Sequence, residues 1–140
     1  MQDWNQQVMD EFRANGGKVA MFGDNPVLLL HSTGAKSGAA RVTPVCYLPA
    51  DGSLHIFASK AGAPENPAWY HNLKAHPNAR IEVGNAAKDG IESHDVIASE
   101  VSGDLRDRIY AAQIDAMPQF AEYEEKTNRR IPVVALKIVD

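Results

Sequence analysis

Hydrophobic positions follow two spacings along this chain, and the spacings divide it into helices and strands. In residues 2–14, Trp4, Val8 and Phe12 recur every four residues, which predicts an amphipathic helix with one apolar stripe. Residues 27–31 form a nearly continuous apolar run, which predicts a short strand buried on both faces.

The same patterns predict six strands and four helices in the whole chain. A turn at 23–26 precedes the first strand, and a hairpin turn at 49–53 and a connection at 84–90 join neighbouring strands. This arrangement predicts an α+β fold, a mostly antiparallel sheet closed into a small barrel with outer helices. The predicted strands are 27–31, 41–48, 54–59, 78–83, 91–101 and 131–138, and the predicted helices are 2–14, 68–75, 102–116 and 118–127.

Three local features refine these elements. Pro44 cannot donate to a ladder, so its strand is expected at a sheet edge or a bulge. Asn66 followed by Pro67 is a typical pair for the N-cap and first position of a helix. The face of the helix at 102–116 that we expect to be buried consists of Leu105, Ile109 and Ala112.

The bulk composition narrows the class of protein. With 140 residues and no repeats, the chain is expected to form one domain over 1–140. A net charge of −4 argues against general nucleic-acid binding. Cys46 is the one cysteine, so no intrachain disulfide forms, and we expect a buried, inert thiol in a reducing compartment.

No targeting or membrane-spanning segment is expected. No apolar run approaches the ~20 residues that span a bilayer, and no signal segment opens the chain. The sequence therefore predicts a cytoplasmic protein. The apolar stripe at 2–14 is expected to pack on the core of the domain. In a minority interpretation this helix covers a cofactor pocket or contacts a membrane surface, although the segment carries few cations.

The loop at 32–41 is the first candidate for chemistry. It combines Gly34 and Gly38 with the cations Lys36 and Arg41. Glycine-rich turns bring backbone N–H groups together around an anion, so the loop is expected to hold the phosphate of a cofactor. An ordinary solvated hairpin loop is the alternative. It is not a Walker A loop, because Ala35 precedes Lys36 and a strand follows.

A second unusual loop spans 60–67 and leads into a helix. Lys60 stands at a strand end, and Trp69 and Tyr70 follow at the helix start, where aromatic rings can stack on a flat ligand. The alternative role for Trp69 is that of an aromatic residue packed in the core. The five histidines show no paired metal spacing, so no metal site is expected.

The late chain offers one further hydroxyl group. Tyr123 follows Phe120 by three residues, so its phenol can point inward and donate a hydrogen bond or a proton, although packing is the commoner role. The nearby charged residues predict a solvated helix end. They are Glu122, Glu124, Glu125, Arg129 and Arg130.

Several separated motifs together resemble the deazaflavin-dependent nitroreductase family, whose fold is a split β-barrel related to flavin-mononucleotide-binding oxidoreductases. They stand in the family's order and cover almost the whole chain. They are residues 11–19, 28–30 with 33–38, 41–44, 58–64 with 67–73, and 130–134.

The resemblance implies an enzyme that uses coenzyme F420, an 8-hydroxy-5-deazaflavin with a phosphate and a polyglutamate tail. A hydride would pass from the reduced deazaflavin to a small electrophilic acceptor such as a quinone, a nitroaromatic or an activated alkene. By this likeness Lys36, Ser37, Gly38 and Arg41 meet the phosphate and tail, Thr43, Pro44, Ala68 and Trp69 border the ring, Ser59 and Lys60 face its pyrimidine edge, and Tyr123 lines the substrate pocket.

One departure from the family pattern keeps two alternatives open. Ala35, Ala39 and Ala40 stand where members often carry bases, so the loop at 34–41 is less cationic than usual. The first alternative is a reductase of the same fold that uses flavin mononucleotide. The second is a non-catalytic protein that binds a cofactor or a lipophile.

Overall fold

The computed structural model describes residues 4–22, 25–85 and 90–139. Residues 23–24 of the predicted turn and residues 86–89 of the predicted connection lie outside the described residues.

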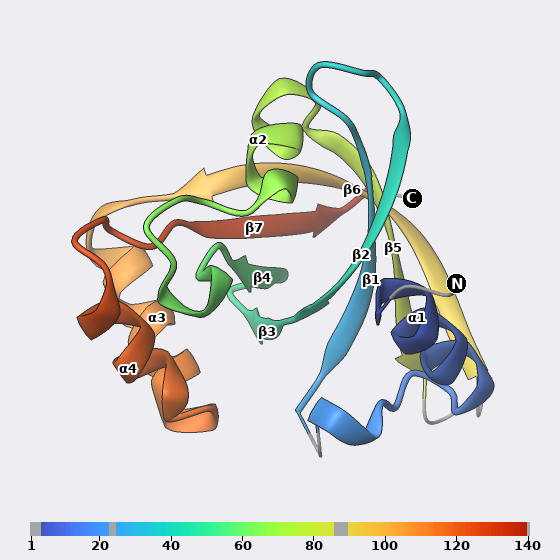
Figure 1. Cartoon of the computed structure of the whole chain (residues 1–140), viewed down its shortest axis with the longest axis horizontal. Helices are drawn as coiled ribbons and strands as arrows, with labels where there is room; N and C mark the ends of the chain where they lie inside the picture. Colours follow the sequence, from blue (N-terminus) through green and yellow to red (C-terminus); the bar gives the residue numbers. More distant parts are fainter. Residues whose placement is uncertain (1–3, 23–24, 86–89, 140) are drawn as a thin grey trace.

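The sheet contains seven strands in the part of the chain that the structure describes, one more than expected. They are β1 (Val27–Thr33), β2 (Ala40–Cys46), β3 (Leu48–Ala50), β4 (Ser53–Phe57), β5 (Asn78–Asn85), β6 (Gly90–Val101) and β7 (Val133–Ile138). Their order is β2-β1-β5-β6-β7-β4-β3, every pair is antiparallel, and the sheet curls into an open barrel (Figure 1).

The extra strand arises because the predicted strand at 41–48 divides in two. β2 pairs with β1, whereas β3 pairs with β4 at the other end of the strand order. The chain crosses between the two sheet edges at Tyr47, whose N–H donates to the Pro26 carbonyl at 3.2 Å. Pro44 lies on the edge strand β2 opposite Leu29, so the first of the two expected positions, edge or bulge, is the one observed.

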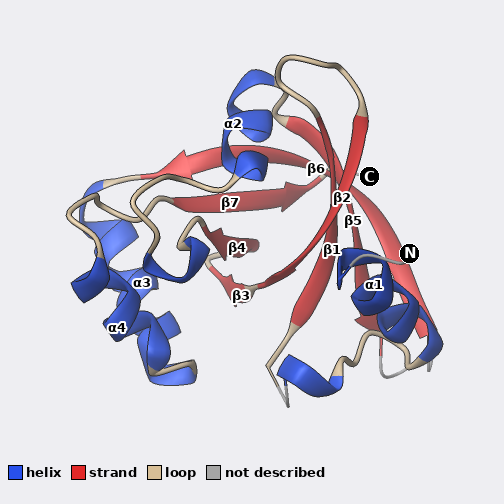
Figure 2. Ribbon diagram, in the orientation of Figure 1, coloured by secondary structure: helices blue, strands red, loops and turns tan. Residues whose placement is uncertain are grey.

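The described residues form four α-helices, which pack around the sheet (Figure 2). Two single turns of 3-10 helix, η1 (Ala20–Phe22) and η2 (Lys60–Gly62), lie in the connections. The α-helices are α1 (Trp4–Ala14), α2 (Ala68–Ala75), α3 (Gly103–Ala116) and α4 (Gln119–Lys126), close to the predicted bounds.

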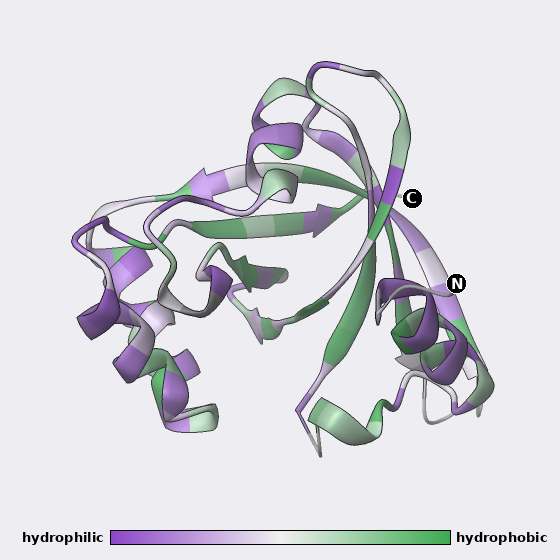
Figure 3. Cartoon of the chain, viewed as in Figure 1, coloured by the Kyte–Doolittle hydropathy of each residue, from purple (hydrophilic) through white to green (hydrophobic). Residues whose placement is uncertain are grey.

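The apolar side chains form three clusters, one for each group of helices. The largest fills the inside of the curl beneath α2, the second lies between α3, α4 and strands β4 and β7, and the third lies beneath α1. The strands facing these clusters are mostly hydrophobic in Figure 3. Leu28, Leu29 and Leu30 are fully buried, each stabilising the fold by about 1.5–3 kcal/mol.

Two local predictions were wrong. The buried face of α3 consists of Arg106, Ile109, Tyr110 and Gln113, while Leu105 is 36% exposed. A stripe that contains an arginine and a glutamine cannot be recognised by hydrophobicity alone. The N-cap of α2 is Pro67 instead of Asn66, whose side-chain oxygen accepts a hydrogen bond from Arg129.

Candidate active site

A large, mainly apolar pocket opens between β2, α2 and α4. Its volume is about 650 Å³. It is lined by Trp4, Met21, Phe22, Asn25, Thr43, Pro44, Val45, Cys46, Phe57, Ser59, Lys60, Pro67, Trp69, Met117, Gln119, Phe120 and Tyr123. Lys60 is the charged residue in this lining, so an anionic or electron-rich edge of a ligand has one cationic partner there.

Trp69 serves both the core and this pocket. It stands in the first turn of α2, is 6% exposed, and packs in the cluster inside the barrel. The indole also contributes to the pocket wall. The core role and the lining role, which the sequence presented as alternatives, are therefore combined in one side chain.

The loop that carries Ser59 and Lys60 has an unusual backbone. Lys60 has φ +45°, a left-handed conformation that costs a non-glycine residue about 1–2 kcal/mol. Its ammonium Nζ lies 2.9 Å from the Glu65 carboxylate, and this hydrogen bond holds the pKa of Glu65 below its usual value. Lys60 thus reaches the pocket from a strained position and already has an anion beside it.

Arg129 holds this loop in place, contrary to the expected solvated helix end. Its guanidinium donates to the carbonyls of Ala58 (2.9 Å), Ser59 (2.8 Å) and Ala63 (3.0 Å). A fourth bond goes to the Asn66 side-chain oxygen at 2.8 Å. The expectation of solvation holds for Arg130, which is exposed and pairs with Asp107.

A second, polar pocket lies on the other side of the start of α2. Its volume is about 580 Å³. It is lined by Gly34, Ala35, Lys36, Ser37, Arg41, Ala68, His71 and Asn72. The lining contains two cationic side chains and no carboxylate, so its field favours an anion.

The glycine loop provides fewer free backbone donors than the sequence suggested. Gly34 N–H donates to the Ala39 carbonyl, and Gly38 N–H donates to the Gly34 carbonyl. Ala39 N–H donates to the Ser37 hydroxyl, and Ala35 N–H donates to the Asn72 side-chain oxygen at 2.9 Å. Anion binding here therefore depends mainly on the two cationic side chains.

Two titratable groups in the apolar pocket are held in their neutral forms. Burial raises the pKa of the Cys46 thiol to about 11, so it is a poor nucleophile at neutral pH. Burial also raises the pKa of Tyr123, which therefore carries its phenol proton at neutral pH. The Tyr123 ring packs edge-on against Phe120, with 5.0 Å between ring centroids.

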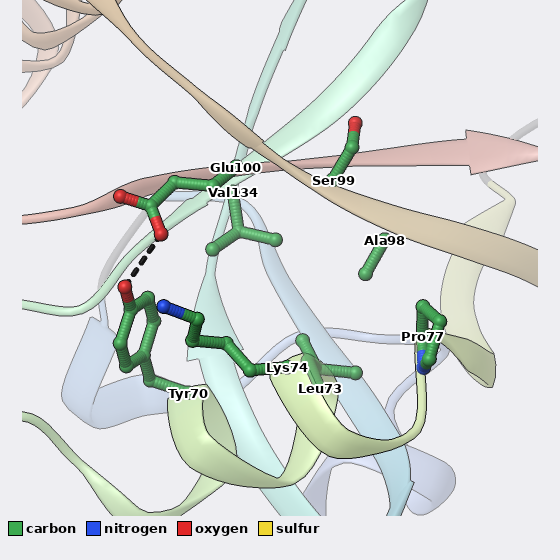
Figure 4. A pocket seen from close by; sticks show the side chains of 8 residues that line it. All are labelled: Tyr70, Leu73, Lys74, Pro77, Ala98, Ser99, Glu100 and Val134. Carbon is green, nitrogen blue, oxygen red and sulfur yellow. Dashed lines mark hydrogen bonds between the residues drawn. The ribbon is translucent and has the colours of Figure 1, made fainter.

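A smaller pocket of about 210 Å³ lies between α2, β6 and β7. Figure 4 shows the Tyr70 hydroxyl donating to the Glu100 carboxylate, an oxygen–oxygen distance of 2.5 Å. Burial raises the pKa of Tyr70 to about 12, so the phenol stays a donor. This bond ties α2 to β6 and so fixes the helix whose first turn separates the two larger pockets.

The structure distributes most of the predicted site residues between the two larger pockets. The apolar pocket contains Thr43, Pro44, Ser59, Lys60, Trp69 and Tyr123, and the polar pocket contains Lys36, Ser37, Arg41 and Ala68. Gly38 has φ +70° at the end of the loop and is not part of either lining. No described helix is long and apolar enough to cross a membrane.

Sequence reasoning missed several residues around these pockets. Asn72 and Arg129 act on loops far away in the sequence, and no local pattern signals this. Met21 and Phe22 reach the apolar pocket from η1, for which nothing was predicted from the sequence, and Trp4 reaches it from α1, for which a pocket-covering role was only the minority interpretation. The aromatic pair Phe120 and Tyr123 was the one local signal for this side of the pocket.

Comparison with known proteins identifies similar chains along nearly the whole length. The model of the F420H2-dependent quinone reductase family matches residues 4–137. The F420H2-dependent quinone reductase Rv1261c of Mycobacterium tuberculosis is 36% identical over 130 residues, which cover 89% of this chain and 83% of that protein.

Solved structures agree with the observed fold. The F420-H2 dependent reductase FDR-A is 37% identical, with a TM-score of 0.68, and the match covers 80% of this chain and 94% of that chain. A chain described as a domain-swapped dimer is 33% identical, with a TM-score of 0.70 and coverage of 94% and 96%. The predicted fold class, an α+β split barrel with outer helices, is confirmed.

Proposed function

This chain belongs to the F420H2-dependent quinone reductase family, and from that premise we propose that it transfers a hydride from reduced coenzyme F420 to a quinone held in its apolar pocket. The predicted oxidoreductase class and cofactor are those of the family. The observation that carries the proposal is the pair of pockets on either side of the first turn of α2.

The residues of both pockets fit an elongated anionic deazaflavin. The polar pocket offers cations without carboxylates, which suits a phosphate and an acidic tail. The apolar pocket offers flat walls from Trp69 and Pro44 and the single cation Lys60, which suit a ring with one polar edge. At about 650 Å³ it has the size of a typical small-molecule site.

The site residues then take the following roles. Lys36, Ser37 and Arg41 would bind the phosphate and tail, with Gly38 shaping the loop. Thr43, Pro44, Ala68 and Trp69 would border the ring, and Ser59 and Lys60 would contact its pyrimidine edge. Each of these residues except Gly38 lines one of the two pockets, and all of them but Ala68, which lines the polar pocket, line the pocket that matches their role.

When bound, reduced F420 supplies the hydride, that is, both electrons of the reduction. The quinone gains this hydride and one proton and leaves as the hydroquinone. The phenol of Tyr123 would donate this proton to the quinone oxygen, because it is protonated and lines the same pocket as Lys60. The apolar walls would keep bulk water from the transfer.

We also propose where the quinone and its apolar part approach. Trp4 is 49% exposed and Met21 is 62% exposed, and both line the apolar pocket. They would receive an apolar tail, and the same rim would make any peripheral contact with a membrane. We further propose that residues 1–140 form one deazaflavin-binding domain, which the single seven-stranded sheet supports.

A binding titration followed by turnover tests the proposal. Purified protein is titrated with oxidised F420 and, separately, with flavin mononucleotide, and fluorescence is followed. We expect selective F420 binding and quinone-dependent oxidation of reduced F420. Selective binding of flavin mononucleotide would assign the other cofactor, and F420 binding without turnover on any acceptor would indicate a carrier protein.

A further inference from the structure

We infer that Arg129 is a positioning residue for this site: its guanidinium sets the geometry of the Ser59–Lys60 segment that faces the apolar pocket. The inference rests on the proposed function for its consequence on cofactor binding. The structural part rests on the contacts of Arg129 alone.

The contacts of Arg129 converge from both ends of one loop. Ala58 and Ser59 stand where the loop leaves β4, and Ala63 and Asn66 stand where it approaches α2. Four donated bonds of 2.8–3.0 Å join these two ends to one guanidinium. A planar fork with five donors can make this set of bonds, whereas a lysine ammonium cannot reproduce it.

The acceptors do not neutralise the arginine. Three are backbone carbonyls and one is a side-chain amide oxygen. The guanidinium is half-buried, so these bonds are stronger than in water, and its charge stays directed at the loop. An arginine with this set of partners fixes a backbone conformation more than it fixes an ion pair.

The loop needs such an external support because its own backbone is strained. Lys60 has a left-handed φ of +45°, and η2 spans one turn, with Gly62 N–H donating to the Ser59 carbonyl at 2.9 Å. A residue in this region of φ persists when its surroundings determine it. Without Arg129, the segment is free to relax and Lys60 leaves its place in the pocket.

The same clamp links the loop to the substrate side of the pocket. Gly62 lies so close to α4 that an added Cβ would stand 2.8 Å from the Lys126 Cβ and 3.1 Å from the Tyr123 carbonyl oxygen. Arg129 follows α4 in the chain. Arg129 therefore holds the loop that carries Lys60 against the helix that carries Tyr123. The distance between the deazaflavin beside Lys60 and the quinone beside Tyr123 depends on this arrangement.

The decisive experiment compares Arg129→Lys with two controls. Arg130→Gln changes an exposed neighbour. Arg106→Gln removes a buried guanidinium that donates to the Ile131 carbonyl and makes no hydrogen bond to the described residues of the loop. We expect Arg129→Lys to bind F420 at least about tenfold more weakly, although its charge is kept. Both controls keep wild-type affinity, while Arg106→Gln lowers the melting temperature.

Two further measurements keep the test independent of global stability and of the cofactor. Amide hydrogen exchange of the apo protein should rise at residues 59–66 in Arg129→Lys and stay unchanged there in Arg106→Gln. Asn66→Ala removes one acceptor in a folded chain, and we expect intermediate loss of affinity. Millimolar guanidinium chloride, and not sodium chloride, should restore binding to Arg129→Ala.

Two results separate the possible failures. If the exchange of residues 59–66 in Arg129→Lys equals that of Arg106→Gln, or if F420 affinity equals the wild type, the inference is wrong. If the wild type does not bind F420, the proposed function is wrong, and the exchange comparison still decides whether Arg129 positions the loop.

Discussion

The role of Lys60 gives a prediction that separates ligand binding from backbone strain. Lys60→Ala removes the single cation of the apolar pocket, and a hydrogen bond to a charged group contributes about 1.5–3 kcal/mol. Lys60 already bonds to Glu65 at 2.9 Å, so F420 binding would replace the Glu65 carboxylate with the cofactor as the partner of Lys60. The net contribution of Lys60 to the binding free energy is therefore expected at the lower end of this range. We therefore expect F420 to bind about 10- to 30-fold more weakly.

A glycine at the same position tests the structural half of the argument. Lys60→Gly loses the same ammonium but adopts φ +45° without the steric cost that alanine shares with the native lysine. We expect equal loss of affinity in the two variants. We also expect Lys60→Gly to be more stable than Lys60→Ala by about 1 kcal/mol, or about 3 °C in melting temperature.

The assay is a fluorescence titration with oxidised F420, paired with thermal unfolding of each variant. Lys137→Ala is the matched control, because Lys137 is exposed on β7. Glu65→Gln should bind F420 about two- to fivefold more tightly, since the anion competing for Lys60 is gone. Equal affinity of Lys60→Ala and Lys137→Ala would refute the placement of Lys60 at the ligand.

Three further predictions concern other parts of the molecule. Tyr110→Phe should lower the free energy of unfolding by about 1–2 kcal/mol in urea titrations, because the buried phenol donates to the Phe120 carbonyl at 2.8 Å. Tyr123→Phe should reduce the turnover number by about tenfold or more with little change in F420 affinity, and the wild-type rate should stay level from about pH 7 to 9 because burial raises the pKa of the phenol. The hydrogen bond from Arg13 holds the pKa of Glu82 in the folded protein below its ordinary value of 4.5. The contribution of ionised Glu82 to the free energy of unfolding is therefore present above pH 4.5 and is lost as the pH falls through the lower pKa of the folded state. The free energy of unfolding of Glu82→Gln, measured toward pH 3, should fall less steeply than that of the wild type.

The fold was largely predictable because its local signals agree with one another. The helix at 68–75 was predicted with its observed bounds, and β5 and β6 end within two residues of expectation. Pro44 was predicted at a sheet edge or a bulge and lies on the edge strand β2, since a residue without an N–H cannot donate to the ladder inside a sheet. These features depend on neighbours in sequence.

The failures share a different physical cause, namely partners distant in sequence. Arg129 reads as part of a charged, solvated cluster until the loop at 58–66 is placed beside it. Leu105 stands at an apolar position of the helical pattern, yet it is exposed. Arg106 is buried instead, because its guanidinium donates a hydrogen bond to the Ile131 carbonyl. The hydrophobic pattern of a segment does not indicate which hydrogen-bond acceptors from distant segments will lie beside it in the fold.

The resemblance supplied what spacing could not. Composition alone left the loop at 34–38 undecided between a solvated turn and an anion site, and its backbone donors are mostly used within the protein. Motif similarity pointed to residues that now line two neighbouring pockets. Their roles toward F420 stay predictions that the titrations above decide.

The strand order has a consequence for the mechanics of the protein. β2 and the β4–β3 pair terminate opposite ends of the strand order, and the apolar pocket takes residues from β2, from β4 and from the turn after β4. A ligand there would contact both edges of the sheet and hold them together for as long as it is bound. At a concentration one hundred times its dissociation constant, such a ligand would add about 2.7 kcal/mol to the free energy of unfolding. Cofactor supply would then set how long the protein survives proteolysis, as well as how fast it turns over.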